Sequence, residues 1–296
     1  MHSITNLINK SWHNPQTNIL CQFYNGIFDN YLANHTSLFG YEIPDWIDSR
    51  IHKNINIIKE NEYLDNAIDA VICNGIEKRD NAIQTVTNLQ VPLITIFHEP
   101  IPQNFNSLPF ETFVSTCQPS MKYIKYGIEE TKIDFNKNRN NTVLIVNDFS
   151  PQEHDFLLHV LREFNGVLIG NNENLSSMKP TEEWHKLMED TKVFVNLSNR
   201  QNIPYPLLYA MDRGCAVVSN LTESLDLFLN NGKNCLIGQS HEEIISHIKL
   251  LLNNEGLREE LSVKGKETIN REFSLSDFNE NWKSLFNEIK QEIFLR

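Results

Sequence analysis

The run Pro204-Tyr-Pro-Leu-Leu-Tyr-Ala-Met-Asp-Arg-Gly-Cys-Ala-Val-Val-Ser219 is the part of the chain that best predicts its fold. Residues 206–213 suit a short helix, and Gly214 stands where a glycine commonly ends one. Residues 215–219 form a short apolar run, which favours a buried strand. A helix leading directly into a buried strand is typical of α/β proteins, in which helices cover both faces of a parallel sheet.

The same alternation of strand and helix extends to both sides of this run. The capping boxes Ser150-Pro-Gln-Glu153 and Ser240-His-Glu-Glu243 each predict the start of a helix. We expect strands over 17–24, 54–59, 68–74, 92–98, 113–117, 142–147, 166–170, 192–197, 215–219 and 234–237. We expect helices over 28–39, 77–89, 119–126, 150–164, 181–190, 206–213, 222–229 and 242–252, with two more in the remaining residues.

The alternation is interrupted once, by the polar segment 127–141, which is the best linker candidate. Two strand–helix series around one linker predict two doubly wound, Rossmann-like domains that face a cleft. We place the first domain at 1–129 and the second at 130–275. In this class of fold, ligands bind in loops at the carboxyl ends of the strands.

Composition and charge exclude several classes of protein. The chain has 296 residues, with 26 Lys and Arg against 38 Asp and Glu, and a net charge of −12. This balance argues against a nucleic-acid binder, because such proteins usually carry a basic stripe. The five cysteines include no Cys-x-x-Cys pair, so we expect reduced, buried thiols in a cytoplasmic protein and no zinc or redox site. We see no secretory signal at the amino end and expect no transmembrane segment.

The C-terminal third of the sequence resembles the group 1, or family 4, glycosyltransferases, which have the GT-B fold. The resemblance rests on the run 204–219, on Glu223-Ser-Leu-Asp226, on Asn231-Gly-Lys-Asn-Cys-Leu-Ile237 and on the helix that follows. It covers about 90 residues, from Asn196 to Phe286. It implies that 276–296 form a helix that crosses back onto the first domain. The apolar residues suited to bury one face of that helix are Phe278, Trp282, Leu285, Phe286, Ile289 and Ile293.

The resemblance also implies a site for a nucleotide-sugar donor. His98, after the strand 92–98, and Gln201 would meet the sugar as the catalytic-site residues. Gly26 would allow the backbone to approach the donor phosphate closely. Without the resemblance, the residues favour a His that caps a strand end for His98 and a plain turn for Gly26.

Two of the family's chemical motifs are altered here. The two glutamates of its E-x7-E motif fall on Gln201 and Tyr209, and Tyr209 would then contact the ribose through its hydroxyl. The family's Arg and Lys after the first strand of the second domain are absent. We therefore expect Arg200 to hold the diphosphate together with the backbone amides of 203–207, among them those of Ile203 and Tyr205. A solvated loop arginine is the alternative for Arg200.

The sequence thus predicts a glycosyltransferase, by resemblance retaining, that uses a nucleotide sugar as substrate and no cofactor. No Asp-x-Asp pair occurs, which agrees with a metal-independent enzyme. The acceptor is open: a glycan, a lipid, a protein, a small molecule or a hydroxymethylated base in viral DNA. A GT-B scaffold that has lost catalysis and acts as a binding or partner subunit is the main alternative, and a nucleotide-sugar epimerase is a weaker one.

Overall fold

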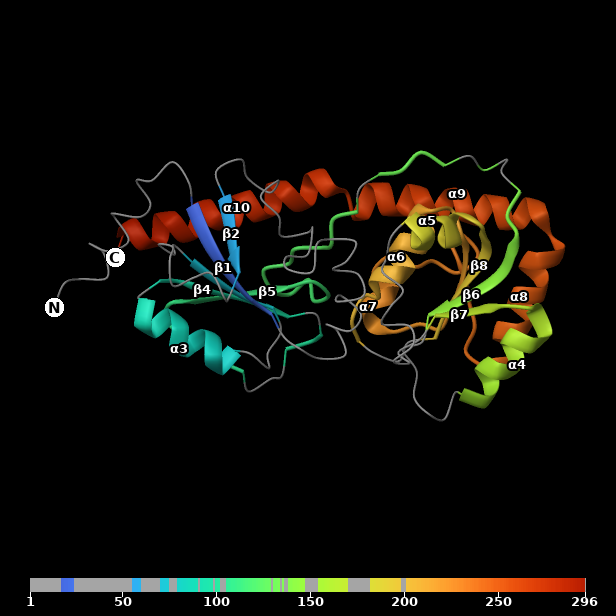
Figure 1. The fold of residues 1–296 in the computed structure, drawn as a ribbon, viewed down its shortest axis with the longest axis horizontal. Helices are drawn as coiled ribbons and strands as arrows, with labels where there is room; N and C mark the ends of the chain where they lie inside the picture. The colour runs from blue at the N-terminus through green and yellow to red at the C-terminus, as the bar shows by residue number, and fades with distance from the viewer. Residues whose placement is uncertain are drawn as a thin grey trace. The chain divides into compact units, whose positions relative to one another are not determined.

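The computed structural model describes residues 17–23, 55–59, 70–74, 79–89, 91–97, 99–101, 105–128, 130–133, 135, 138–146, 154–169, 182–197 and 201–295. These residues divide between two compact units. Unit 1 comprises Met1–Gly127 and Ser276–Arg296, and unit 2 comprises Ile128–Leu275. Figure 1 shows the elements of both units.

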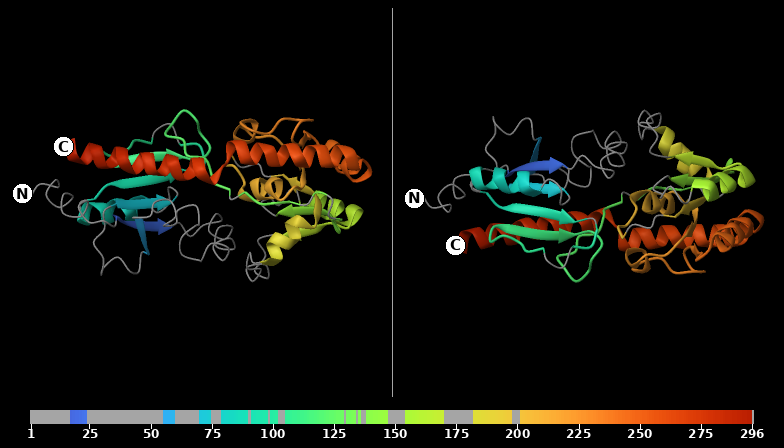
Figure 2. Two further views of the ribbon diagram at one scale, coloured as in Figure 1. Left: turned by 90° about the horizontal axis from the view of Figure 1, so that it is seen from above. Right: turned by 90° about the horizontal axis from the view of Figure 1, so that it is seen from below.

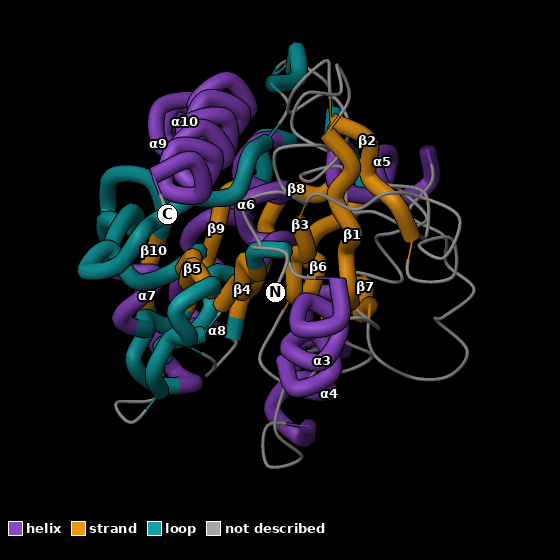
Figure 3. Tube along the Cα trace, turned by 90° about the vertical axis from the view of Figure 1, so that its left-hand side faces the viewer, coloured by secondary structure: helices purple, strands orange, loops and turns teal. Residues whose placement is uncertain are grey.

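Unit 1 contains a five-stranded parallel sheet in the order β2-β1-β3-β4-β5. Its elements are β1 (Thr17–Phe23), β2 (Ile55–Lys59), β3 (Ala70–Asn74), α3 (Arg79–Leu89), β4 (Leu93–Phe97), β5 (Glu111–Ser115) and α10 (Leu275–Leu295), whose first residue lies in unit 2. Figure 3 shows α3 and α10 on opposite faces of this sheet. The helix expected at 28–39 lies outside the described residues.

Helix α10 runs beside the strands of unit 1 to the C-terminus (Figure 2). The side chains of Phe278, Trp282, Leu285 and Ile289 are all buried, and Trp282 is 1% exposed. Lys122, after β5, forms an ion pair with Glu288 of α10. The predicted helix that returns to the first domain is therefore confirmed. The side chains of Phe286 and Ile293 lie outside the described residues.

A buried ion pair links the first residue of α3, Arg79, to the first residue of β5, Glu111. Arg79 donates from Nε and Nη2 to the two carboxylate oxygens of Glu111, at 2.7 and 2.5 Å. Thr95 of β4 donates to the same carboxylate at 2.6 Å, and the Phe105 ring lies 4.6 Å below the Arg79 guanidinium. Several charge-assisted bonds on one carboxylate offset its desolvation. They hold the amino end of α3 against β4 and β5.

Unit 2 contains a second five-stranded parallel sheet, in the order β10-β9-β8-β6-β7. Its strands are β6 (Asn141–Val146), β7 (Val167–Ile169), β8 (Thr191–Asn196), β9 (Ala216–Ser219) and β10 (Leu236–Ile237). Its helices are α4 (His154–Phe164), α5 (Glu182–Glu189), α6 (Tyr205–Asp212), α7 (Glu223–Asp226), α8 (His241–Asn253) and α9 (Glu255–Glu272). Figure 1 shows α4 and α8 on one side of this sheet and α5 and α6 on the other. The doubly wound α/β class is thus confirmed.

The capping signals are confirmed where the structure describes them. Ser240 Oγ accepts from the Glu243 amide at 3.2 Å, which begins α8 as the capping box predicts. Gly214 has φ +71°, the left-handed value that suits a glycine after a helix, and it ends α6. The capping box at 150–153 lies outside the described residues.

Three expected elements differ from the structure. Residues 119–126 are not helical, because Ser115 takes up their backbone bonds: its amide donates to Lys122 O and its carbonyl accepts from Ile124 N, both at 2.9 Å. The segment therefore runs beside the end of β5. The expected strand 113–117 begins two residues earlier, as β5, and the expected helix 222–229 shortens to the four residues of α7.

The polar segment expected as a linker belongs to unit 2 from Ile128 onward. The Ile128 amide donates to Phe273 O at 2.8 Å, and Asn270 donates to Glu130 at 2.8 Å. Thr131 and Arg139 bond further residues of unit 2, described below. These contacts attach the segment to α9 and α6, so its polar side chains serve hydrogen bonds within a folded domain.

Candidate functional site

The topology of unit 2 indicates where a ligand binds. From β6 the chain goes first to β7 on one side of the sheet and then to β8 on the other, so the strand order reverses between β6 and β8. In open α/β sheets, ligands bind at the carboxyl ends of the strands beside such a reversal. The loop after β6 lies outside the described residues. The loop from β8 to α6 is therefore the central described part of the site.

The loop from β8 to α6 is fastened to the neighbouring loop after β9. The Asn196 side chain donates to Ser219 Oγ at 2.9 Å, and the Asn220 amide donates to Asn196 O at 3.1 Å. Farther along, Ser224 Oγ of α7 donates to Gln201 O. The carboxyl ends of β8 and β9 thus carry two loops held at fixed separation.

Prolines shape the start of α6. Pro204 is its N-cap residue and Pro206 its second residue, and neither has an amide proton. The Leu207 amide donates to Pro204 O at 3.1 Å, inside the first turn. In the run 203–207, amides that can face an anion are therefore restricted to Ile203 and Tyr205.

The residues expected at the site fall into two groups. Gly26, His98 and Arg200 lie outside the described residues. Gln201 is exposed at the loop, and its carbonyl binds Ser224. The Ile203 side chain is 0% exposed, so only its backbone can meet a ligand. Tyr205 is the first residue of α6, and its side chain lies outside the described residues.

Tyr209 lies one turn farther along α6 and is 6% exposed. Its hydroxyl accepts a hydrogen bond of 2.7 Å from Arg213 Nη2, and the Arg213 guanidinium lies 4.7 Å from the centre of its ring. Burial raises the pKa of Tyr209 to about 12, although the Arg213 charge acts in the opposite direction. The phenol is therefore neutral at physiological pH and already paired with a cation.

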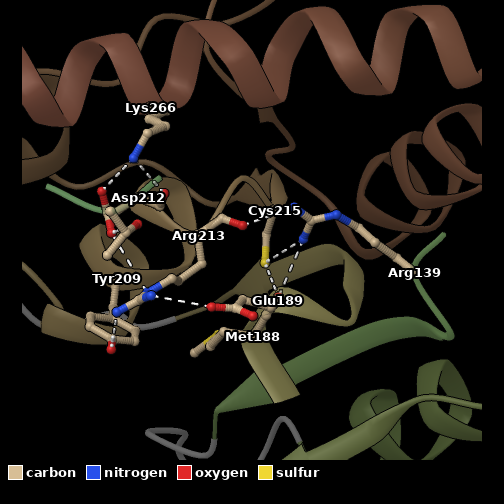
Figure 4. A network of polar contacts seen from close by, with 9 residues as sticks. Arg139, Met188, Glu189, Tyr209, Asp212, Arg213, Cys215 and Lys266 are labelled. Atoms are coloured by element: carbon tan, nitrogen blue, oxygen red, sulfur yellow. Dashed lines mark hydrogen bonds and ion pairs between the residues drawn. The ribbon is translucent and has the colours of Figure 1, made fainter. Parts of the chain in front are cut away.

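A network of polar contacts surrounds the carboxyl end of α6 (Figure 4). Asp212 is fully buried and accepts from Lys266 Nζ of α9 at 2.9 Å and from Thr131 Oγ1 at 2.7 Å. Arg213 reaches Glu189 of α5 at 3.3 Å. The charge of Asp212 is thus compensated by Lys266 of α9, and Thr131, in the chain segment that precedes β6, adds a hydrogen bond.

Arg139 completes this network from the same segment. Its guanidinium donates to Thr191 O at 2.8 Å, to Met188 O at 3.3 Å and to Arg213 O at 2.9 Å. Beside it, the Cys215 thiol donates to Met188 O at 3.1 Å, and burial raises the pKa of that thiol to about 12. Cys215 is therefore a protonated core residue. Cys73, Cys117 and Cys235 are also buried, and none of the three forms a disulfide.

The sequence did not point to Asp212, Arg213, Lys266 or Arg139. A signal existed for one pair only: Tyr209 and Arg213 are four residues apart, the spacing at which side chains meet on a helix. Lys266 and Arg139 reach α6 from more than 50 residues away, so sequence spacing gives no indication of their contacts.

The described residues offer neither a metal site nor a helix that spans a membrane. No group of three His, Cys, Asp or Glu side chains in those residues is placed to hold a metal ion. Among the helices that the structure describes, none has the length and apolar character needed to cross a bilayer.

Comparison with known proteins adds evidence of two kinds. The family described as "Glycosyl transferase-like" matches residues 152–283, a span that contains α6 and the loops at the carboxyl ends of β8 and β9. The sequence matches no curated protein.

Solved structures share the fold. HepE of Anabaena, determined with UDP and glucose, has a TM-score of 0.60 at 10% identity, over 92% of this chain and 100% of that one. A glycosyltransferase from Rickettsia africae has a TM-score of 0.58 at 11% identity, over 94% and 99%. TarM of S. aureus, determined with UDP, has a TM-score of 0.55 at 16% identity, over 74% of this chain and only 55% of TarM.

The chain thus spans about half the length of TarM and the whole length of HepE. At these identities the structural likeness shows the fold, and the family match over the second unit is independent of it. Residues 152–283 thus match the family described as "Glycosyl transferase-like", within a chain that has the GT-B fold.

Proposed function

We propose that this chain is a glycosyltransferase that moves a sugar from a nucleotide-diphosphate sugar to an acceptor hydroxyl. One observation carries the proposal: the family match covers the carboxyl-end loops and α6, where the reversal of strand order would place a ligand. Support comes from HepE and TarM, whose structures were determined with UDP.

In this proposal the protein contributes positioning and electrostatic stabilisation. The amides of Ile203 and Tyr205, together with Arg200, hold the diphosphate, and Gly26 allows close approach of the backbone. Gln201 and His98 meet the sugar, and Tyr209 meets the ribose. The reaction retains the configuration of the anomeric carbon and uses no metal ion. The acceptor is a hydroxyl of a glycan, lipid, protein or modified nucleic acid.

A thermal-shift panel of nucleoside diphosphates and nucleotide sugars tests donor binding. A ligand at 100 times its Kd stabilises the folded state by about 2.7 kcal/mol. Release of nucleoside diphosphate, with and without candidate acceptors, then tests transfer. A donor that binds and is turned over supports the enzyme, whereas a blank across the panel contradicts donor binding.

Arg200→Ala tests the diphosphate assignment. A charge-assisted bond to phosphate is worth about 1.5–3 kcal/mol, or roughly one to two decades in Kd. The variant should therefore weaken a nucleoside diphosphate by that factor and leave the bare nucleoside unchanged. Equal weakening of both ligands would show that Arg200 is a structural residue.

A second function is favoured by one observation. Tyr209 stands where the resembling family has a glutamate, and its hydroxyl is bonded to Arg213. A GT-B scaffold that binds a nucleotide sugar without transferring it would tolerate this replacement. A wild-type chain that binds a nucleotide sugar yet leaves it intact with every acceptor class would establish this function instead.

A further inference from the structure

Asn202 and Thr222, near the carboxyl ends of β8 and β9, each have a buried side-chain oxygen with no hydrogen-bond partner in the part of the chain that the structure describes. One is Oδ1 of Asn202, a residue that is 3% exposed, in the loop between β8 and α6. The other is Oγ1 of Thr222, in the loop between β9 and α7. Thr222 is the N-cap residue of α7, but its side chain does not cap that helix.

Three polar side chains in the same two loops and strand ends, those of Asn196, Ser219 and Ser224, are paired. Asn196 donates to Ser219, Ser219 Oγ donates to Asn220 O at 2.6 Å, and Ser224 donates to the carbonyl of Gln201. Gln201 precedes Asn202 directly, and Ser224 lies two residues after Thr222. The two loops are therefore fastened together on either side of the unpaired oxygens.

Unpaired buried polar atoms are rare in native proteins, because each has lost its hydrogen bonds to water without replacement. Their presence at the carboxyl ends of two neighbouring strands suggests that a ligand supplies the missing bonds. The chemistry of Asn202 Oδ1 restricts that ligand. An amide oxygen only accepts hydrogen bonds, so its partner must be a donor, and a phosphate oxygen is not one.

We infer that Asn202 Oδ1 and Thr222 Oγ1 bind hydroxyl groups of the sugar in the nucleotide-sugar donor. This inference rests on the proposed function and deepens it. Asn202 and Thr222 are then specificity-determining residues: they contact the sugar to be transferred, and they add nothing to the binding of the diphosphate.

The test compares two ligands by isothermal titration calorimetry, starting with UDP and UDP-glucose and, if neither binds, using the best pair from the thermal-shift panel. Asn202→Leu keeps the side-chain volume and removes the oxygen. It should raise the Kd of the nucleotide sugar about tenfold, which corresponds to about 1.4 kcal/mol. The Kd of the nucleoside diphosphate should change less than about twofold. Thr222→Val should act in the same direction and also serves if Asn202→Leu fails to fold.

Thr191→Val is the matched control. Thr191 lies at the opposite end of β8, is 0% exposed, and donates to Leu187 O at 2.7 Å. Loss of this hydrogen bond should lower Tm and leave the ratio of the two Kd values unchanged. The inference is overturned if the Asn202 and Thr222 variants leave that ratio unchanged or weaken both ligands equally, although bound UDP would still support the proposed function. A wild-type chain that binds no nucleotide overturns both.

Discussion

The two ends of α6 are built in opposite ways. At the carboxyl end, Asp212 is paired with Lys266 and Thr131, and Arg213 is paired with Glu189. Ahead of the amino end, Asn202 keeps a buried oxygen without a partner. Satisfied buried charges hold a helix in place, whereas an unsatisfied buried group costs free energy until a ligand binds it. If the inference above holds, stability is concentrated at one end of α6 and ligand binding at the other.

The largest expected loss of stability comes from removing the cation that pairs with Asp212 at the carboxyl end of α6. Lys266→Met leaves the Asp212 carboxylate buried without its main cation, and such losses cost about 3–5 kcal/mol. We expect a loss of about 3 kcal/mol in the free energy of unfolding by urea, because Thr131 and Arg213 still contact the carboxylate.

Lys264→Met is the matched control on the same helix. Lys264 is exposed and pairs only with Glu267, three residues away. Exposed pairs of this kind contribute little, so the variant should unfold at the same urea concentration as the wild type. Equal losses for the two variants would contradict a special role for Asp212.

The next effect concerns the turn that ends α6. Gly214 and Gly232 both have left-handed backbones, with φ +71° and +74°. An added Cβ at Gly214 would lie 2.8 Å from Arg139 Nη2, whereas at Gly232 it would meet nothing within 4 Å. Each substitution to Ala pays about 1–2 kcal/mol for the backbone. We expect Gly214→Ala to cost about 1–3 kcal/mol more than Gly232→Ala in urea unfolding, because it also overpacks the network.

A smaller effect depends on pH. Tyr209→Phe removes the bond to Arg213 and should cost about 1 kcal/mol at neutral pH. Burial holds the pKa of the folded phenol at about 12, above the ordinary value of about 10. The folded state thus binds this proton more tightly than the unfolded state. Its contribution to stability is complete below about pH 10 and is lost as the pH rises toward 12.

An ultraviolet titration of the phenols checks this prediction. The wild type should show a phenol that ionises near pH 12 and is missing from Tyr209→Phe. If the phenol that disappears titrates near pH 10, Tyr209 is solvated and its burial against Arg213 is wrong.

The smallest expected effect is at the amino end. Without ligand, Asn202→Leu should leave Tm unchanged or raise it slightly, because it removes a buried oxygen that has no bond to lose. Asn234→Leu is the contrasting variant, since Asn234 bonds Asn230 N, Phe228 O and Thr268 Oγ1. That variant should melt at a clearly lower temperature. A comparable loss in Asn202→Leu would show that Asn202 has a structural partner.

The sequence predicted elements best where a local signal defines them. The run 204–219 predicted both α6 and β9, because apolar spacing and Gly214 act within a few residues. The prediction from sequence was wrong at 119–126, where a helix was expected to start at Pro119. There the bonds to Ser115 bring together residues that sequence spacing does not relate.

For the candidate site, the sequence pointed to the loop and helix that carry Gln201 and Tyr209, and the strand order of unit 2 points to the same loop. It did not show that Arg213 occupies the Tyr209 hydroxyl, nor that Asn202 is buried without a partner. The roles of Gly26, His98, Arg200, Gln201 and Tyr209 toward a donor stay predictions.

The sequence by itself determined the fold class and the strand–helix order, because apolar periodicity and capping depend on residues close together in the chain. The return of α10 onto the first domain came from the resemblance to the glycosyltransferases. The tertiary structure alone decided which polar groups are satisfied. Lys266 and Thr131 reach Asp212 across 54 and 81 residues. Only the packing of α9 and of segment 128–140 around α6 brings such groups within hydrogen-bonding distance. The same packing leaves Asn202 Oδ1 and Thr222 Oγ1 buried and unpaired.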